Sequence, residues 1–153
     1  MRHCSPEEII FAATDLLADT KLAPELSNEA HYYRAKAYLD AGKTDGAMED
    51  LKVLAKDTRN VYGAEAKYKV AQIYFDGGQT DKAEQEVLNY IEVSTPHTYW
   101  LARSFVLLAD VYMKLGRNLD AKQYLLSLKQ NYQADDDIAG MIESRLEKLK
   151  TEN

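Results

Sequence analysis

The stretch AKAYLDAGKTDGAMEDLKVL, residues 35–54, returns twice further along the chain, and this repetition decides the fold. The later copies are AQIYFDGGQTDKAEQEVLNY at residues 71–90 and ADVYMKLGRNLDAKQYLLSL at residues 109–128, so successive copies begin 36 and 38 residues apart. Each copy has an initial Ala, a Tyr three residues later, a Gly four residues after the Tyr, and an Ala five residues after the Gly. A repeat of this length indicates a series of similar two-element units that stack on one another.

Each copy predicts two helices joined at the Gly. Small and aromatic residues recur every three or four positions before the Gly, and Ala83, Val87 and Tyr90 share one helical face after it. Glycine ends a helix readily because it adopts a left-handed conformation without Cβ strain. The residues predicted to do so are Gly42, Gly78 and Gly116. The residues predicted to cap the following helices, two positions later, are Thr44, Thr80 and Asn118.

Single helices are predicted on both sides of the repeated region. Ser5, Pro6 and Glu8 form a strong helix-start signal, with Ser5 as the N-cap. Near the other end, an apolar stripe predicts a terminal helix that covers the last unit, and three preceding aspartates are interpreted as its N-cap and acidic first turn rather than as a calcium loop. The stripe is Ile138, Met141, Ile142, Leu146 and Leu149, and the aspartates are Asp135, Asp136 and Asp137.

The repeated pattern of small residue, Tyr, Gly, small residue and apolar residue resembles the tetratricopeptide repeat family, and it covers about residues 28–132. The resemblance implies an all-α fold, a right-handed α-solenoid of antiparallel helix pairs. The expected division of a single domain, residues 1–153, is an N-terminal half-repeat helix at 5–22, repeats at 28–58, 62–94 and 97–132, and a capping helix at 136–150. One departure from the family is the large residue early in the first helix, which is His31, Lys67 and Phe105 in the three copies.

The resemblance also implies where a partner would bind, because the first helix of each pair lines the concave face in this family. The predicted peptide or partner-binding residues are Tyr32, Lys36, Leu39, Tyr68, Gln72, Phe75, Arg103, Val106 and Asp110. Their neighbours on the same faces include Met113 and Lys114. One subclass of the family grips a terminal carboxylate with Lys and Asn, but here Tyr32 and Tyr68 stand at the Lys positions, so that clamp is not expected.

The predicted function is that of a non-enzymatic interaction module or scaffold, which binds an extended peptide or a partner helix. The alternative is a self-associating assembly subunit that uses the exposed N-terminal helix, since a homodimer could cover the side left open by a missing upstream helix. The half-repeat start suggests the C-terminal fragment of a longer bacterial protein, and the alternative is a short protein whose first helix is itself a cap. The overall sequence is similar in character to bacterial repeat proteins of cell-envelope assembly. This similarity suggests that the protein is located in the periplasm or the envelope, with the cytoplasm as the alternative.

Other functions are not supported by the sequence. Gly42, Lys43 and Thr44 fit a loose phosphate-binding loop, but the segment before them is helical in its spacing and the later copies lose the Lys-Thr pair. A net charge of −6 disfavours nucleic acid. The chain has a single cysteine and scattered histidines, so no metal site and no cofactor are predicted. No apolar run is long enough for membrane insertion.

Overall fold

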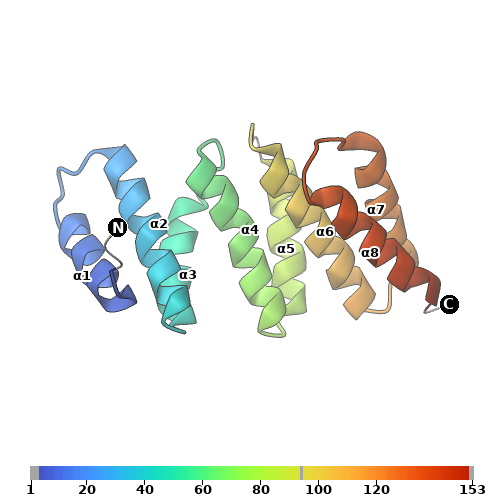
Figure 1. Ribbon diagram of the computed structural model, residues 1–153, viewed down its shortest axis with the longest axis horizontal. Coiled ribbons are helices and arrows are strands. Elements are labelled where there is room, and N and C mark those ends of the chain that lie inside the picture. Colours follow the sequence, from blue (N-terminus) through green and yellow to red (C-terminus); the bar gives the residue numbers. More distant parts are fainter. Residues whose placement is uncertain (1–3, 94, 152–153) are drawn as a thin grey trace. The chain divides into compact units, whose positions relative to one another are not determined.

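The computed structural model describes residues 4–93 and 95–151, and every regular element within them is an α-helix (Figure 1). The helices are α1 (Pro6–Leu17), α2 (Pro24–Asp40), α3 (Thr44–Leu54), α4 (Val61–Asp76), α5 (Thr80–Glu92), α6 (Thr98–Lys114), α7 (Asn118–Asn131) and α8 (Ile138–Thr151). Residue 94, the predicted end of the second repeat, lies outside the described residues. The predicted all-α architecture of paired helices is confirmed.

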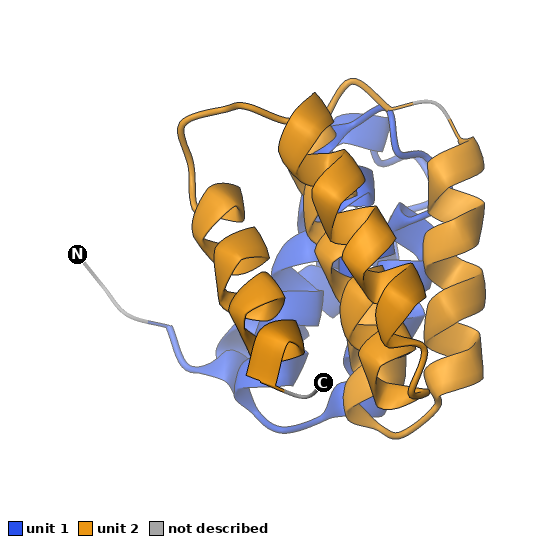
Figure 2. Ribbon diagram, turned by 90° about the vertical axis from the view of Figure 1, so that its right-hand side faces the viewer, with its two compact units in different colours: residues 1–70 blue, residues 71–153 orange. Residues whose placement is uncertain are grey.

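The chain divides into two compact units, Met1–Val70 and Ala71–Asn153, and the division falls within α4 (Figure 2). In the first unit α2 packs against both α1 and α3. In the second unit α6 packs against α5 and α7, and α8 packs against α7 and α6. Each unit therefore has its own set of neighbouring helices that bury apolar faces against one another.

The three repeated glycines form the same helix-ending turn. Their φ angles are 74° at Gly42, 80° at Gly78 and 76° at Gly116. In the first copy the Lys43 N–H donates to the Tyr38 carbonyl at 2.8 Å, and the Gly42 N–H donates to the Leu39 carbonyl at 3.1 Å. The same two bonds recur in the other copies with the same lengths. This pair of bonds is the Schellman motif, and it explains why Tyr and Gly keep a fixed spacing.

The prediction that Thr44, Thr80 and Asn118 are N-caps is wrong. They are the first residues of α3, α5 and α7, and the N-caps are the preceding Lys43, Gln79 and Arg117, none of which makes a side-chain cap hydrogen bond. The reason is that the residue after each Gly ends one helix through its N–H and begins the next through its carbonyl, as in the bonds from Lys43 to Tyr38 and from Ala47 to Lys43. The turn is therefore one residue shorter than the capping pattern implied.

Repeated alanines lie where the helices pack most closely. Each of the six is 1% exposed or less, and they are Ala35, Ala47, Ala71, Ala83, Ala109 and Ala121. A larger side chain at such a position would force the helices apart or adopt a strained rotamer. The predicted role of these small residues at helix contacts agrees with their burial.

A polar cluster occupies the core between α2 and α3. Asp50 is 1% exposed, and its carboxylate accepts hydrogen bonds from Arg34 Nη2 at 2.6 Å and Arg34 Nε at 2.8 Å. His31 Nδ1 lies 2.7 Å from the same carboxylate, so Nδ1 carries the shared hydrogen. Arg34 also donates to Thr14 Oγ1 of α1 at 3.0 Å, and the cluster thus joins all three helices.

The equivalent positions in the last copy carry apolar and aromatic side chains. Phe105 and Leu108 stand where His31 and Arg34 do, and Tyr124 stands where Asp50 does. The rings of Phe105 and Tyr124 are 6.2 Å apart, within the range of aromatic pairing. His31, a departure from the family pattern, is therefore matched by a compensating carboxylate on the neighbouring helix.

The two ends of the described chain differ in how their helices begin. At α1 the Glu8 N–H donates to Ser5 Oγ at 3.2 Å, and Pro6 is the first helical residue, as predicted. At α8 the prediction of an acidic first turn is wrong, because the helix begins at Ile138 and all three aspartates precede it. Asp136 accepts a hydrogen bond from the Ile138 N–H at 2.9 Å, so one of the three does satisfy the helix start.

Candidate functional site

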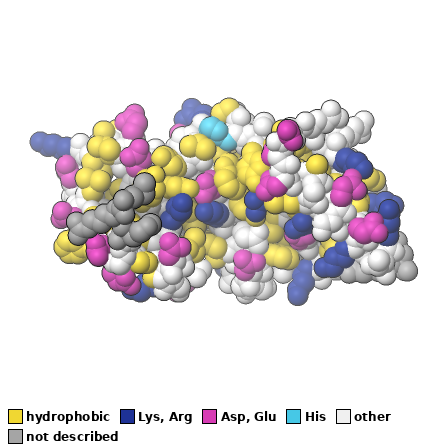
Figure 3. Space-filling view, viewed as in Figure 1, with side chains coloured by type: hydrophobic (Ala, Val, Ile, Leu, Met, Phe, Trp, Pro, Cys, Tyr) yellow, Lys and Arg dark blue, Asp and Glu magenta, His cyan; other side chains and the backbone are white. Residues whose placement is uncertain are grey.

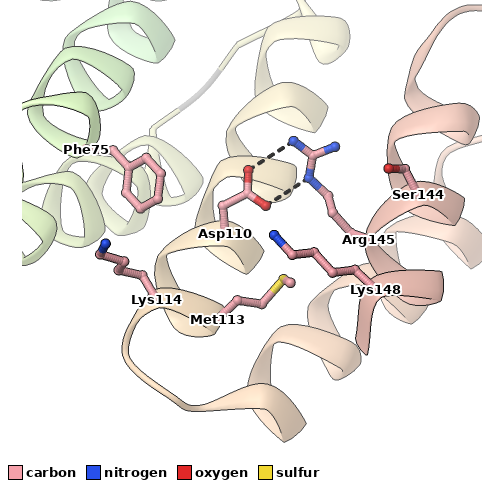
Figure 4. A pocket seen from close by; sticks show the side chains of 7 residues that line it. All are labelled: Phe75, Asp110, Met113, Lys114, Ser144, Arg145 and Lys148. Carbon is pink, nitrogen blue, oxygen red and sulfur yellow. Dashed lines mark hydrogen bonds and ion pairs between the residues drawn. The ribbon is translucent and has the colours of Figure 1, made fainter. Parts of the chain in front are cut away.

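A pocket of about 460 Å³ lies in the second unit, between the end of α4, the last turns of α6 and α8 (Figure 4). Seven residues line it, namely Phe75, Asp110, Met113, Lys114, Ser144, Arg145 and Lys148. Phe75 and Asp110 are predicted binding residues, and the structure brings them together. The pocket is thus formed by α4 and α6, which are the first helices of two repeated pairs, and α8 forms an additional wall.

An ion pair fixes the centre of the pocket. Arg145 donates from Nε and Nη2 to the two carboxylate oxygens of Asp110, at 2.8 and 3.0 Å. Its third nitrogen, Nη1, donates to the Met141 carbonyl at 3.3 Å. Two parallel charge-assisted bonds hold both side chains in one orientation. Asp110 is therefore neutralised by Arg145, and the pair links α6 to α8.

Two lysines give the pocket a net positive charge. Within residues 4–93 and 95–151, neither Lys114 nor Lys148 forms an ion pair, and both side chains are exposed. Lys148 extends from α8 toward the α6 side of the pocket, while Lys114 extends toward Phe75 (Figure 4). Phe75 and Met113 are partly exposed and supply apolar surface beside these charges. The pocket therefore combines apolar contact area with two ammonium groups.

The first unit carries a cluster of aromatic side chains around Tyr32 of α2. The Tyr32 hydroxyl lies 3.1 Å from each carboxylate oxygen of Glu65, to which it donates, and Glu65 also pairs with Lys69 at 2.7 Å. The Tyr62 ring centroid is 4.6 Å from that of Tyr32, and Lys36 Nζ lies 5.4 Å from the Tyr32 ring. Burial, followed by the charge of Glu65, raises the pKa of Tyr32 to about 12, so the hydroxyl remains a donor. Tyr32 and Lys36 are thus held close together on α2.

Two of the predicted binding residues belong to the core instead. Tyr68 is 6% exposed and Val106 is 3% exposed, so neither offers a surface to a partner in this structure. Eight of the 17 residues of α6 are buried, because α6 packs against three other helices of its unit and more than one of its faces is covered. Equivalent positions in different repeats therefore differ in burial, and a binding residue cannot be assigned from its position in the repeat alone.

The remaining predicted residues lie apart from the pocket lining. Leu39 is partly buried on α2, and Gln72 donates to Asp76 at 2.8 Å. Arg103 Nη1 donates to the Tyr99 hydroxyl at 3.0 Å, and that hydroxyl donates in turn to Asp137 at 2.9 Å. Gln72 and Arg103 are therefore engaged in networks with neighbouring side chains.

The sequence reasoning missed the contribution of α8. Ser144, Arg145 and Lys148 line the pocket, although α8 was expected only to cover the last repeat. Ile138, Ile142 and Leu149 form its buried face, while Met141, Arg145 and Lys148 follow at helical spacing on an adjacent face. This second stripe is the signal in the sequence that could have identified them.

A second surface, in the first unit, is apolar. A groove of about 290 Å³ runs between α1 and α2 and is lined mainly by Ile9, Ala12, Leu16, Leu26 and Tyr33. Next to it in sequence, Phe11 is 77% exposed. In Figure 3, hydrophobic side chains are visible in the region of α1 and the start of α2, among acidic and basic ones. Exposed apolar surface of this kind marks interaction sites in soluble proteins.

Among the described residues, no group of three or more His, Cys, Asp or Glu side chains is placed to hold a metal ion. No helix within the same residues combines the length and apolar character needed to cross a bilayer.

Comparison with known proteins gives two matches to family models, both described as tetratricopeptide repeat. One covers residues 29–57 and the other covers residues 102–131. These ranges contain most of α2 with α3 and most of α6 with α7, which are the helix pairs joined at Gly42 and Gly116. Searches of curated proteins and of solved structures returned no match. With the repeated Tyr and Gly turn and the paired helices, these matches show that the chain contains tetratricopeptide repeats.

Proposed function

We propose that this chain is a non-enzymatic interaction module that binds a peptide segment of a partner protein at the pocket between α4, α6 and α8. Tetratricopeptide repeats generally mediate protein–protein interactions, and they are typically non-enzymatic. We also propose that residues 28–58, 62–94 and 97–132 form three repeats within one domain, since the same glycine turn occurs in each.

The observation that carries this proposal is the composition of the pocket. Phe75 on α4 and Met113 on α6 offer apolar contact area, and the Asp110–Arg145 pair links α6 to α8. Phenylalanine and methionine are both enriched in the buried cores of protein–protein interfaces. A site of about 460 Å³ has room for one or two side chains of a bound peptide.

The test uses selection from a display library of random peptides of about twelve residues. We expect the purified chain to select peptides, and the double variant Phe75→Ala plus Met113→Ala to bind them at least about tenfold more weakly, because it removes the apolar contact area. Leu119→Ala is the matched control, since Leu119 is 70% exposed on α7 and does not line the pocket. If no peptide is selected, or if the double variant binds as well as the wild type, the proposed function is wrong.

A second candidate function is self-association through the groove between α1 and α2. The apolar lining of that groove and the exposure of Phe11 favour it. The partner in this case is a second copy of the chain, with apolar side chains from both copies removed from water.

Sedimentation of the chain at several concentrations tests this candidate. Self-association predicts a dimer whose fraction rises with concentration and which is lost in Phe11→Ser plus Leu16→Ser. Leu119→Ser, which removes another exposed apolar side chain, leaves the dimer intact on this hypothesis. A monomer at all concentrations contradicts it.

A further inference from the structure

We propose that the pocket between α4, α6 and α8 selects acidic peptides, and that Lys114 and Lys148 recognise aspartate or glutamate side chains of the partner. This inference rests on the proposed function, since it names the ligand class of the same site. It adds a charge preference that the family assignment does not supply.

The lining of the pocket carries a net positive charge. The pocket lining contains three cationic side chains and one carboxylate, and the carboxylate of Asp110 is bonded through both oxygens to Arg145. Lys114 and Lys148 therefore contribute a net local charge of about +2. Because neither forms an ion pair within the described residues, a ligand carboxylate would not need to displace an existing partner.

Lys114 and Lys148 lie where one bound segment could contact both. They come from α6 and α8, and Figure 4 shows Lys148 extending toward Asp110 and Lys114 extending toward Phe75. A segment bound between these helices would meet cationic groups from both. Apolar surface from Phe75 and Met113 lies next to the charges, which favours a ligand with an acidic residue adjacent to a large apolar one.

The charge distribution favours a short acidic peptide over a polyanion such as nucleic acid as the ligand. The chain as a whole carries a net charge of −6, so the field at a distance repels nucleic acid. Two lysines beside the apolar surface of Phe75 and Met113 match one or two carboxylates at short range, where charge complementarity gives specificity. The pocket therefore fits a short acidic segment of a protein.

The experiment compares peptides selected by the wild type with those selected by Lys114→Glu plus Lys148→Glu. Both lysines are exposed, so the reversal leaves the core unchanged. The matched control is Lys21→Glu plus Lys122→Glu, which changes the net charge equally at exposed positions outside this pocket. Circular dichroism of all three proteins confirms that helix content is retained.

We expect the wild type to enrich peptides in Asp or Glu next to a large apolar residue. Selected peptides, synthesised with amidated C-termini so that side chains supply the only carboxylates, should bind the reversed variant about tenfold more weakly. The control variant should bind them as the wild type does. Raising the salt concentration from ~0.05 to ~0.5 M should weaken wild-type binding, because the lysines are exposed to solvent.

Each contrary result has a separate meaning. Selected peptides without acidic enrichment, or equal binding by the reversed variant, overturn the charge preference and leave the peptide-binding function standing. Loss of binding on amidation also overturns it, because the recognised carboxylate would then be the chain terminus. Failure to select any peptide overturns both proposals.

Discussion

Replacing Asp50 by alanine is expected to lower the free energy of unfolding by about 3 kcal/mol, because it leaves the Arg34 guanidinium without its partner between the helices. Asp50 is 1% exposed. Its carboxylate accepts hydrogen bonds from Arg34 Nε and Nη2 and from the His31 ring nitrogen. Arg34 and His31 are partly exposed, at 19% and 17% of their side-chain surfaces, so the effect lies at the lower end for a broken buried pair. Urea denaturation of the purified variant measures it.

A triple variant tests whether stability depends on the polar groups of this cluster or only on none of them being left without a partner. His31→Phe, Arg34→Leu and Asp50→Tyr together install the side chains that Phe105, Leu108 and Tyr124 supply in the last copy. Replacement of a whole ionic cluster by well-packed apolar groups is often neutral or stabilising, so this variant should recover most of the lost stability. An Asp50→Ala variant that unfolds at the wild-type urea concentration would show that the cluster is not needed for stability.

Replacing Gly63 by alanine is expected to destabilise the fold by about 3 kcal/mol, the upper end for an overpacked site. A Cβ atom at Gly63 would lie 1.9 Å from the Asp57 carbonyl oxygen and 2.6 Å from the Leu54 carbonyl oxygen. Both are backbone atoms that cannot rotate away, so α4 must shift from the end of α3. The shift would also strain the bond from the Gly63 N–H to Asn60 Oδ1, now 2.8 Å.

Gly140 provides the matched control with the opposite sign. It also lies in a helix, but a Cβ atom there would meet no atom within 4 Å. Gly140→Ala should therefore stabilise the chain by about 0.5–1 kcal/mol through helix propensity alone. Thermal unfolding of both variants tests the pair, and equal effects at the two positions would contradict the close approach at Gly63.

Local stereochemistry explains why much of the fold could be predicted from the sequence. The left-handed turn at Gly42 depends on residues within six positions, and the Tyr38 carbonyl accepts its bond at a fixed spacing. The N-caps could not be predicted in the same way, because Lys43 serves two helices at once. That sharing depends on how tightly α2 and α3 approach, which no single-residue preference encodes.

Burial and long-range pairing account for what the sequence reasoning missed. His31 and Asp50 are 19 residues apart, so the hydrophobic pattern marks each as a polar residue without indicating that they pair. Tyr68 occupies a position equivalent to Tyr32 but is buried, since packing differs between repeats. Arg145 and Lys148 belong to α8, whose apolar stripe predicted only that this helix covers the last repeat. Their position beside Asp110 follows from the fold alone.

The most direct test of the central claim is to map peptide binding on the isotope-labelled chain by nuclear magnetic resonance. A selected peptide should shift the backbone amide signals of α6 and α8 around Asp110, Met113 and Arg145, together with that of Phe75, and leave those of α1 unchanged. Shifts concentrated on α1 and α2, with none around Asp110 and Arg145, would contradict a binding site in this pocket.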